Sequence, residues 1–117
     1  MRILVVDDTE TVRLLLAHYL GALGHEVVTL DSGLRVAAQL AGGAFDALLT
    51  DVAMPDCSGW DVLKAARAAV PELPVIVMTG WDDVRGPGGV QPDAVLEKPF
   101  TLDRIRAVLE GVTRARR

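Results

Sequence analysis

The chain has 117 residues, which suits one compact domain and is too short for two. Hydrophobic residues make up 50% and charged residues 24%, as in soluble globular proteins, and no apolar run approaches the roughly 18 residues of a membrane span. The net charge of −4 argues against nucleic acid as a direct partner, and the single cysteine excludes an internal disulfide. We therefore expect a single domain over residues 1–117 that works in the cytoplasm without membrane insertion.

Short apolar runs alternate with segments of helical periodicity along the chain. Taken in order, the apolar runs predict strands at residues 3–6, 26–30, 47–50, 74–79 and 94–98. Hydrophobic residues at helical spacing predict helices at residues 12–23, 34–40 and around 62–66, and a last helix that Thr101 caps and that reaches residue 112. This alternation indicates an α/β protein with a doubly wound, five-stranded parallel sheet.

The segment between the last two predicted strands departs from this pattern. A parallel connection normally contains a crossover helix. Residues 80–93, with the sequence GWDDVRGPGGVQPD, are rich in glycine and proline, and both residue types oppose helix formation. We therefore expect the fourth helix to be short or missing, with at most a turn or two at residues 82–85.

Polar side chains stand where four of the predicted strands end. Asp7 and Asp8 follow the first strand, Asp51 follows the third, Thr79 ends the fourth and Lys98 ends the fifth. The carboxyl ends of parallel strands lie along one edge of the sheet, which is where open α/β folds place their sites. If the first and third strands are neighbours, three carboxylates meet in one place.

The chemistry of this group points to a metal ion and a phosphoryl group. Three carboxylates repel one another, and a divalent cation with oxygen ligands relieves the repulsion, which suits Mg²⁺. Lys98 adds an ammonium group and Thr79 a hydroxyl donor, so that the charge of phosphoryl oxygens can be neutralised. Asp51 can then act as the nucleophile and become an aspartyl-phosphate.

Each of these residues alone has a simpler structural explanation. Asp7 or Asp8 could cap the first helix, Thr79 could be an ordinary strand-end residue, and Lys98 could be a surface lysine before Pro99. Their joint placement at four strand ends favours a functional site.

The sequence also resembles a known family in several motifs. The stretches ILVVDD, LLTDVAMPDCSG, VIVMTG and LEKPFT, in this order over nearly the whole chain, resemble the CheY-like receiver domain of bacterial two-component response regulators. The resemblance implies the strand order 2-1-3-4-5 and a phosphoprotein in signal transduction. Such a domain takes a phosphoryl group from the phosphohistidine of a histidine kinase or histidine phosphotransfer protein. The only catalysis implied is the domain's own phosphorylation and dephosphorylation.

The resemblance also implies ligands for Mg²⁺. Asp51 would be the phosphoacceptor and would contribute to metal binding. Asp8 would bind the ion directly, Asp7 would act through a water molecule, and the backbone carbonyl of Ala53 would complete the protein ligands.

The resemblance assigns the remaining groups to the phosphoryl oxygens and to a conformational switch. Thr79 and Lys98 would contact the oxygens, and the bond between Lys98 and Pro99 would be cis. The family usually has Tyr or Phe three residues before the lysine as a switch coupled to the threonine, but this chain has Val95. The aromatic half of the switch is therefore missing. Because the fourth helix, part of the family's usual output face, is expected to be short or missing, activation through dimerisation on that face is not expected.

Two further positions tune the lifetime of the phosphoryl group in the family. They are Ala53 and Trp81 in this chain, and neither side chain can position an attacking water by hydrogen bonding. The hypothesis is slow self-dephosphorylation, although Trp81 could equally be a loop aromatic packed on its neighbours.

Other interpretations of the sequence remain open. The receiver could be a stand-alone regulator, a relay element or the receiver of a hybrid kinase, with an unknown output protein. A degenerate module that binds proteins without phosphorylation is the main alternative. A haloacid-dehalogenase-type phosphatase would need a D-x-D spacing that the chain lacks after its first strand, and a flavin binder would not have an acidic loop there. Cys57 has no neighbouring base in the sequence, so a reactive thiol is not expected.

Overall fold

The computed structural model describes residues 1–80 and 91–115 of the chain. Its elements, in chain order, are β1 (Arg2–Val6), α1 (Glu10–Ala22), β2 (Glu26–Leu30), the 3₁₀ turn η1 (Gly33–Arg35), α2 (Val36–Gly42), β3 (Ala47–Asp51), α3 (Gly59–Ala69), β4 (Val75–Thr79), β5 (Ala94–Glu97) and α4 (Leu102–Ala115). No helix among these residues is long and apolar enough to cross a membrane.

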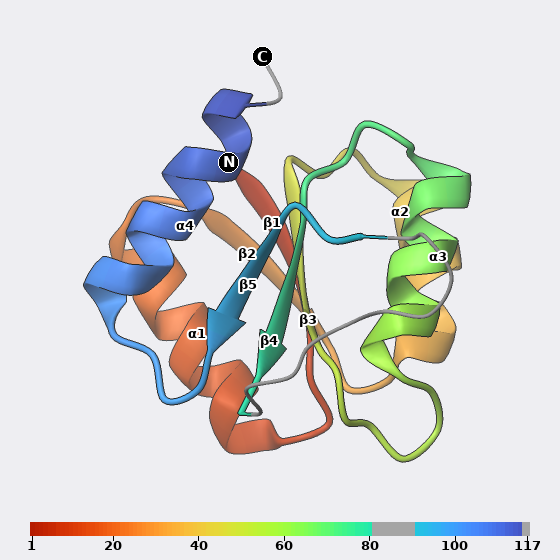
Figure 1. Ribbon diagram of the computed structural model, residues 1–117, viewed down its shortest axis with the longest axis horizontal. Helices are drawn as coiled ribbons and strands as arrows, with labels where there is room; N and C mark the ends of the chain where they lie inside the picture. The colour runs from red at the N-terminus through yellow and green to blue at the C-terminus, as the bar shows by residue number, and fades with distance from the viewer. Residues whose placement is uncertain (81–90, 116–117) are drawn as a thin grey trace.

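The strands form one parallel sheet in the order β2-β1-β3-β4-β5, which confirms the predicted fold class (Figure 1). Helices α1 and α4 cover one face of the sheet, and α2 and α3 cover the other. The sequence predicts that the helix between β4 and β5 is short or missing. That expectation concerns residues 81–90, which lie outside the described residues.

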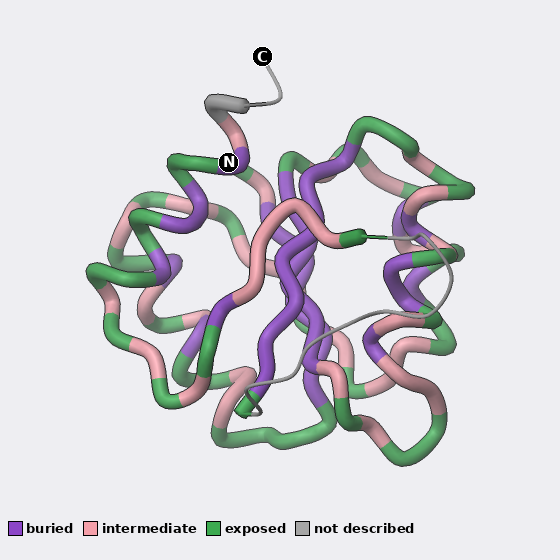
Figure 2. The backbone as a smooth tube through the Cα atoms, viewed as in Figure 1, coloured by how far each residue is buried: buried purple, intermediate pink, exposed green. Residues whose placement is uncertain are grey.

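The alternation of side chains along the central strands builds a core on each face of the sheet. Ile3, Val5 and Leu49 pack toward α1 and α4, whereas the neighbouring residues Leu4 and Leu48 pack toward α2 and α3. Every residue of β3 and β4 is buried, but the edge strands β2 and β5 are only partly covered (Figure 2). Continuous apolar runs are therefore found where the sheet is covered on both sides, as parallel sheets require.

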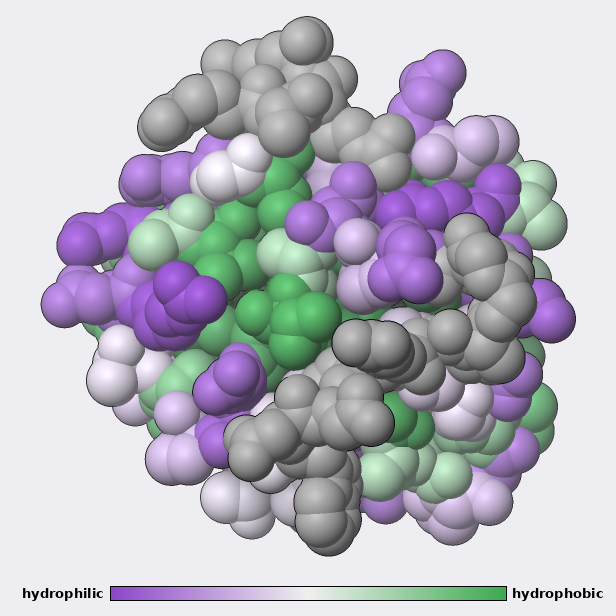
Figure 3. Space-filling view, in the orientation of Figure 1, coloured by the Kyte–Doolittle hydropathy of each residue, from purple (hydrophilic) through white to green (hydrophobic). Residues whose placement is uncertain are grey.

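The surface near β5 is partly apolar. Figure 3 shows hydrophobic side chains where this edge strand meets α4, with hydrophilic side chains around them. Ala94 and Phe100 are only partly buried and pack against the core on this face.

Helix ends follow from local polar groups. Ser58 and Asp61 form a capping box at the start of α3, with the Ser58 side chain accepting from the Asp61 N–H and the Asp61 side chain accepting from the Ser58 N–H. At α4 the Arg104 N–H donates to the Thr101 hydroxyl oxygen at 3.2 Å, which confirms the predicted cap. Gly24 follows α1 with a φ of +90°, a conformation that favours glycine.

Candidate functional site

The predicted site residues meet at one edge of the sheet. Asp7 follows β1, Asp51 is the last residue of β3, Thr79 is the last residue of β4 and Lys98 follows β5. Because β1, β3, β4 and β5 are consecutive parallel neighbours in the sheet, their carboxyl ends bring these side chains to one place. The prediction that the strand ends converge is therefore confirmed.

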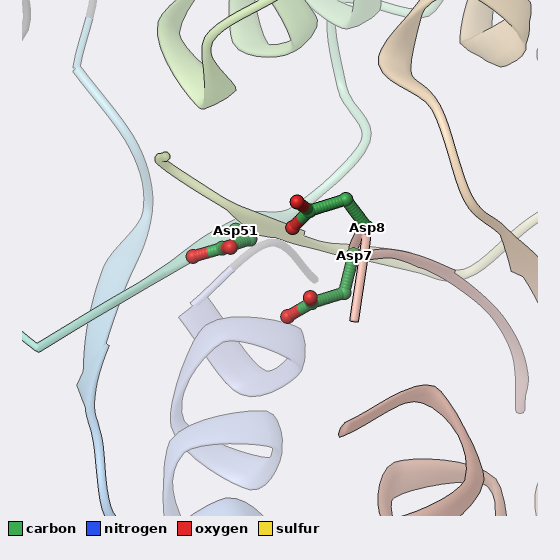
Figure 4. Close-up of side chains that lie close together, drawn as sticks. All are labelled: Asp7, Asp8 and Asp51. Atoms are coloured by element: carbon green, nitrogen blue, oxygen red, sulfur yellow. The ribbon is translucent and has the colours of Figure 1, made fainter. Parts of the chain in front are cut away.

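Three carboxylates form the centre of this edge. One oxygen each from Asp7, Asp8 and Asp51 can be chosen so that all lie within 4.8 Å of one another, and Figure 4 shows the three groups side by side where β1 and β3 end. Asp7 is fully buried and Asp51 is 7% exposed, whereas Asp8 is exposed. Buried like charges at this spacing need a positive partner.

Lys98 supplies part of the positive charge. Its Nζ lies 3.1 Å from Oδ1 of Asp51 and 3.3 Å from Oδ2 of Asp7, so one ammonium group bridges two strands. Burial alone would lower the pKa of Lys98, but its hydrogen bonds to the two carboxylates and their charges outweigh burial and raise it. The side chain therefore stays charged at neutral pH.

Asp51 has an unusual environment for a carboxylate. Burial raises its pKa above the ordinary value, and the charge of Asp7 acts in the same direction. The hydrogen bond and charge of Lys98, together with a hydrogen bond from the backbone of Val52, oppose this shift without cancelling it. Three carboxylates thus lie beside one lysine, and a further cation would offset the remaining negative charge.

Every polar atom of Asp7 has a hydrogen-bond partner. Its N–H donates to the carbonyl of Leu30 at 3.1 Å, and its Oδ1 accepts from the Thr9 N–H at 2.8 Å. Its Oδ2 contacts Lys98, and its backbone carbonyl accepts from Nη1 of Arg13 at 2.7 Å. The residue at the N-cap of α1 is Thr9, so Asp7 is a fixed part of the site and not the helix cap.

The loop after Asp51 explains the glycine that closes it. The Gly59 N–H donates to the carbonyl of Val52 at 2.9 Å, so the chain turns back on the end of β3. A Cβ on Gly59 would lie 2.3 Å from the Asp51 carbonyl oxygen, so only glycine allows this approach. Ala53 lies exposed in the loop, and the role of its carbonyl stays a prediction.

The remaining predicted residues lie around this centre. Thr79 is 2% exposed, and its carbonyl accepts from the Lys98 N–H at 2.7 Å. The Lys98–Pro99 bond is cis, as the resemblance implies. Val95 is half-buried in β5 opposite Val77 of β4. Trp81 lies outside the described residues.

Sequence reasoning missed Arg13 and assigned no contact to Gly59. The contact of Arg13 is with a backbone carbonyl, which no pairing of residue types would reveal. Arg13 is the fourth residue of α1 and stands one helical turn after Thr9. Its place in the first turn of the helix that follows Asp7 and Asp8 was the available sign that it lies near these residues.

Carboxylates at this spacing, with a lysine and a buried threonine beside them, can hold a hard divalent cation through oxygen atoms. A family model described as the response regulator receiver domain matches residues 3–110. The chain belongs to this family. It is 36% identical to the transcriptional regulatory protein TcrA of Mycobacterium tuberculosis over 97% of its own length and 46% of TcrA. It is also 36% identical to the response regulator MprA of Mycobacterium avium over 97% of its length and 51% of MprA. The receiver domain thus spans about half the length of these relatives.

Solved structures agree with this assignment. The chemotaxis protein CheY4 of Vibrio cholerae superposes with a TM-score of 0.88 and 28% identity, over 95% of this chain and 97% of that one. The response regulator TrrA of Thermotoga maritima, solved in complex with Mg²⁺ and BeF, gives a TM-score of 0.86 and 28% identity over the same shares.

Proposed function

We propose that this receiver domain accepts a phosphoryl group on Asp51 with the help of Mg²⁺ and signals through phosphorylation-dependent protein contacts. The donor would be the phosphohistidine of a histidine kinase or histidine phosphotransfer protein in the cytoplasm. The observation that carries the proposal is the Lys98 bridge between Asp51 and Asp7 beside the exposed Asp8. This arrangement supports the proposal, because transfer to Asp51 needs a carboxylate, a positive charge and oxygen ligands close together.

The acids of the site fit a magnesium ion. Asp8 and Asp51 would bind it directly, Asp7 would act through water, and the carbonyl of Ala53 would add a further oxygen. When bound, Mg²⁺ supplies positive charge to the phosphoryl oxygens and offsets the repulsion among the carboxylates. A complex with Mg²⁺ and BeF is known for TrrA, a relative of the same fold, and this supports the assignment.

The chain's own groups would carry the transfer. A carboxylate oxygen of Asp51 forms the new bond to phosphorus while the bond from phosphorus to the histidine nitrogen breaks, and that nitrogen keeps the electron pair. Lys98, which contacts Asp51 before transfer, would turn its ammonium group to a phosphoryl oxygen. The Thr79 hydroxyl would donate to another oxygen.

The output of the domain is expected to differ from the usual aromatic switch. Val95 cannot couple to Thr79 through a ring, so phosphorylation would act through Thr79, Lys98 and the loop after Asp51. Ala53 offers no side-chain hydrogen bond to an attacking water, and we expect the aspartyl-phosphate to outlast a few seconds. Decay within seconds would contradict this expectation.

The test is intact mass spectrometry after incubation with Mg²⁺ and acetyl phosphate. We expect a single phosphoryl adduct that disappears in Asp51→Asn and when EDTA removes the metal. Asp46→Asn is a matched control, because it makes the same substitution just before the other end of β3 and should keep the adduct. An adduct that persists in Asp51→Asn would refute the acceptor. If acetyl phosphate and phosphohistidine donors all failed, the domain would instead be a binding module without phosphorylation.

A further inference from the structure

Arg13 donates a hydrogen bond to a backbone carbonyl and not to a carboxylate. Its guanidinium lies near an edge of the sheet that carries three carboxylates, yet its Nη1 donates to the backbone carbonyl of Asp7, at 2.7 Å. It forms no ion pair with any residue that the structure describes. The contact is partly buried, and it joins α1 to the end of β1.

This contact controls the peptide unit that leads to Asp8. The carbonyl of Asp7 and the N–H of Asp8 belong to one planar group, so fixing the carbonyl fixes the direction in which the chain enters Asp8. The remaining polar atoms of Asp7 are held by Leu30, Thr9 and Lys98. Arg13 thus completes the set of contacts that fixes this peptide.

Asp8 depends on its backbone for its position. Its carboxylate is exposed and accepts no hydrogen bond from the described part of the chain, unlike Asp7 and Asp51. A side chain without hydrogen-bond partners is aimed mainly by the backbone that carries it. Each peptide beside Asp8 has a hydrogen bond, from Arg13 to the Asp7 carbonyl on one side and from the Thr9 N–H to Asp7 Oδ1 on the other. Of these two restraints on the aim of Asp8, only the first comes from a side chain of α1.

We propose that Arg13 is a positioning residue for the metal site, which holds the Asp7–Asp8 peptide so that the Asp8 carboxylate reaches the cation. This inference rests on the proposed function, since it concerns the same magnesium site. It gives the Arg13 guanidinium a specific role, beyond that of one more positive charge near the acids.

The two explanations of Arg13 predict opposite signs. If Arg13 acts only through its charge, its removal makes the site more negative and divalent cations bind more tightly. If Arg13 positions Asp8, its removal lets that ligand move and cations bind more weakly. The direction of the change in metal affinity therefore separates the explanations.

The experiment measures the dissociation constant of Mn²⁺ from the intact chain by electron paramagnetic resonance, with Mg²⁺ as competitor. Arg13→Met removes the hydrogen-bond donors and the charge but keeps an unbranched side chain. We expect binding about 10-fold weaker, as for the loss of a group that orients a metal ligand. The matched control is Arg35→Met, which removes an exposed arginine paired with Asp31 and should change affinity little.

A double-mutant cycle shows whether Arg13 acts through Asp8. We expect Arg13→Met to weaken Mn²⁺ binding in the native chain but to have little further effect in the Asp8→Asn background. Equal losses in both backgrounds would overturn the proposal, and so would unchanged or tighter binding by Arg13→Met. Arg13→Lys keeps a charge and a shorter donor, so it should recover part of the affinity, and it carries the test if Arg13→Met does not fold.

Phosphorylation separates this inference from the proposed function. If the native chain binds Mn²⁺ and forms the Asp51 adduct while Arg13→Met binds Mn²⁺ equally well, only the positioning role is wrong. If the native chain binds no divalent cation, the magnesium site and the role of Arg13 are both refuted.

Discussion

The two ends of β3 each carry an aspartate, and the two aspartates have different environments. Asp46, just before the strand, is exposed, and its Oδ2 accepts from the Arg2 N–H at 2.7 Å. Asp51, at the other end, is 7% exposed and lies close to Asp7, after the neighbouring strand β1, and to Lys98, after β5. The same residue type accepts a backbone hydrogen bond from β1 at one end and belongs to a charged cluster at the other.

The difference comes from the direction of the strands. At the carboxyl edge, β1, β3 and β5 each deliver a charged residue at or just after their last residue. β1 and β3 are neighbours in the sheet, and β5 is separated from β3 by β4 alone. At the amino edge a cavity of about 380 Å³ lies beside Asp46 and Glu72, but no lysine or arginine is among its described lining residues. The amino edge thus has a cavity lined by two acids, whereas the carboxyl edge brings three carboxylates and a lysine together.

The largest effect on this comparison is expected from Gly59→Ala. The added Cβ would lie 2.3 Å from the Asp51 carbonyl oxygen and 2.8 Å from Cα of Val52, so the loop or the end of β3 must shift. We expect a loss of about 3 kcal/mol in unfolding free energy, at the upper end of overpacking effects. Urea denaturation measures it. The control is Gly42→Ala, whose Cβ would meet no atom within 4 Å, and an equal loss there would contradict the argument.

Removing Lys98 should unbalance the carboxyl edge. In Lys98→Met the carboxylates of Asp7 and Asp51 lose their shared ammonium group, and we expect the metal-free domain to lose about 2 kcal/mol of stability. Metal binding should persist, because the three acids remain. Thermal unfolding with and without Mg²⁺ measures both effects. A variant that no longer binds Mg²⁺ would show that Lys98 has another role, and the control Lys64→Met removes an exposed lysine of α3.

The convergence of Asp7, Asp51 and Lys98 could be predicted from the sequence because each residue directly follows or ends an apolar strand. Because parallel strands all end at the same edge of the sheet, the three residues are expected to meet at that edge. The contrast between buried Asp7 and exposed Asp8 could not be predicted, because it depends on where α1 begins. The segment predicted as a helix at residues 34–40 begins as the 3₁₀ turn η1, where the Ser32 hydroxyl oxygen accepts from the Leu34 N–H, before α2 continues.

A smaller effect, of opposite sign to that of Lys98→Met, is expected for Asp51→Asn without metal. The folded-state pKa of Asp51 is raised, so ionisation of this carboxyl opposes folding at neutral pH. Asp51→Asn should therefore be more stable than the native chain in EDTA, and the gain should shrink as the pH falls through the raised pKa and the native carboxyl protonates. Thermal unfolding against pH measures it, and Asp46→Asn should show no such gain. A native chain that is more stable than Asp51→Asn at neutral pH would contradict the raised pKa.

The smallest effect concerns Cys57, in the loop that follows Asp51 at the same edge. Burial raises the pKa of this thiol, and the charges of Asp56 and Asp61 add to the shift against an opposing hydrogen bond from the Gly33 backbone. Because the thiolate is the reactive form, iodoacetamide should label the folded protein more slowly at neutral pH than the urea-unfolded chain, and the folded rate should keep rising at pH values where the unfolded thiol is already ionised. Initial labelling rates against pH measure both. Equal rates in the folded and unfolded chains would contradict the raised pKa of Cys57 and would mean that neither burial nor the charges of Asp56 and Asp61 slow its labelling.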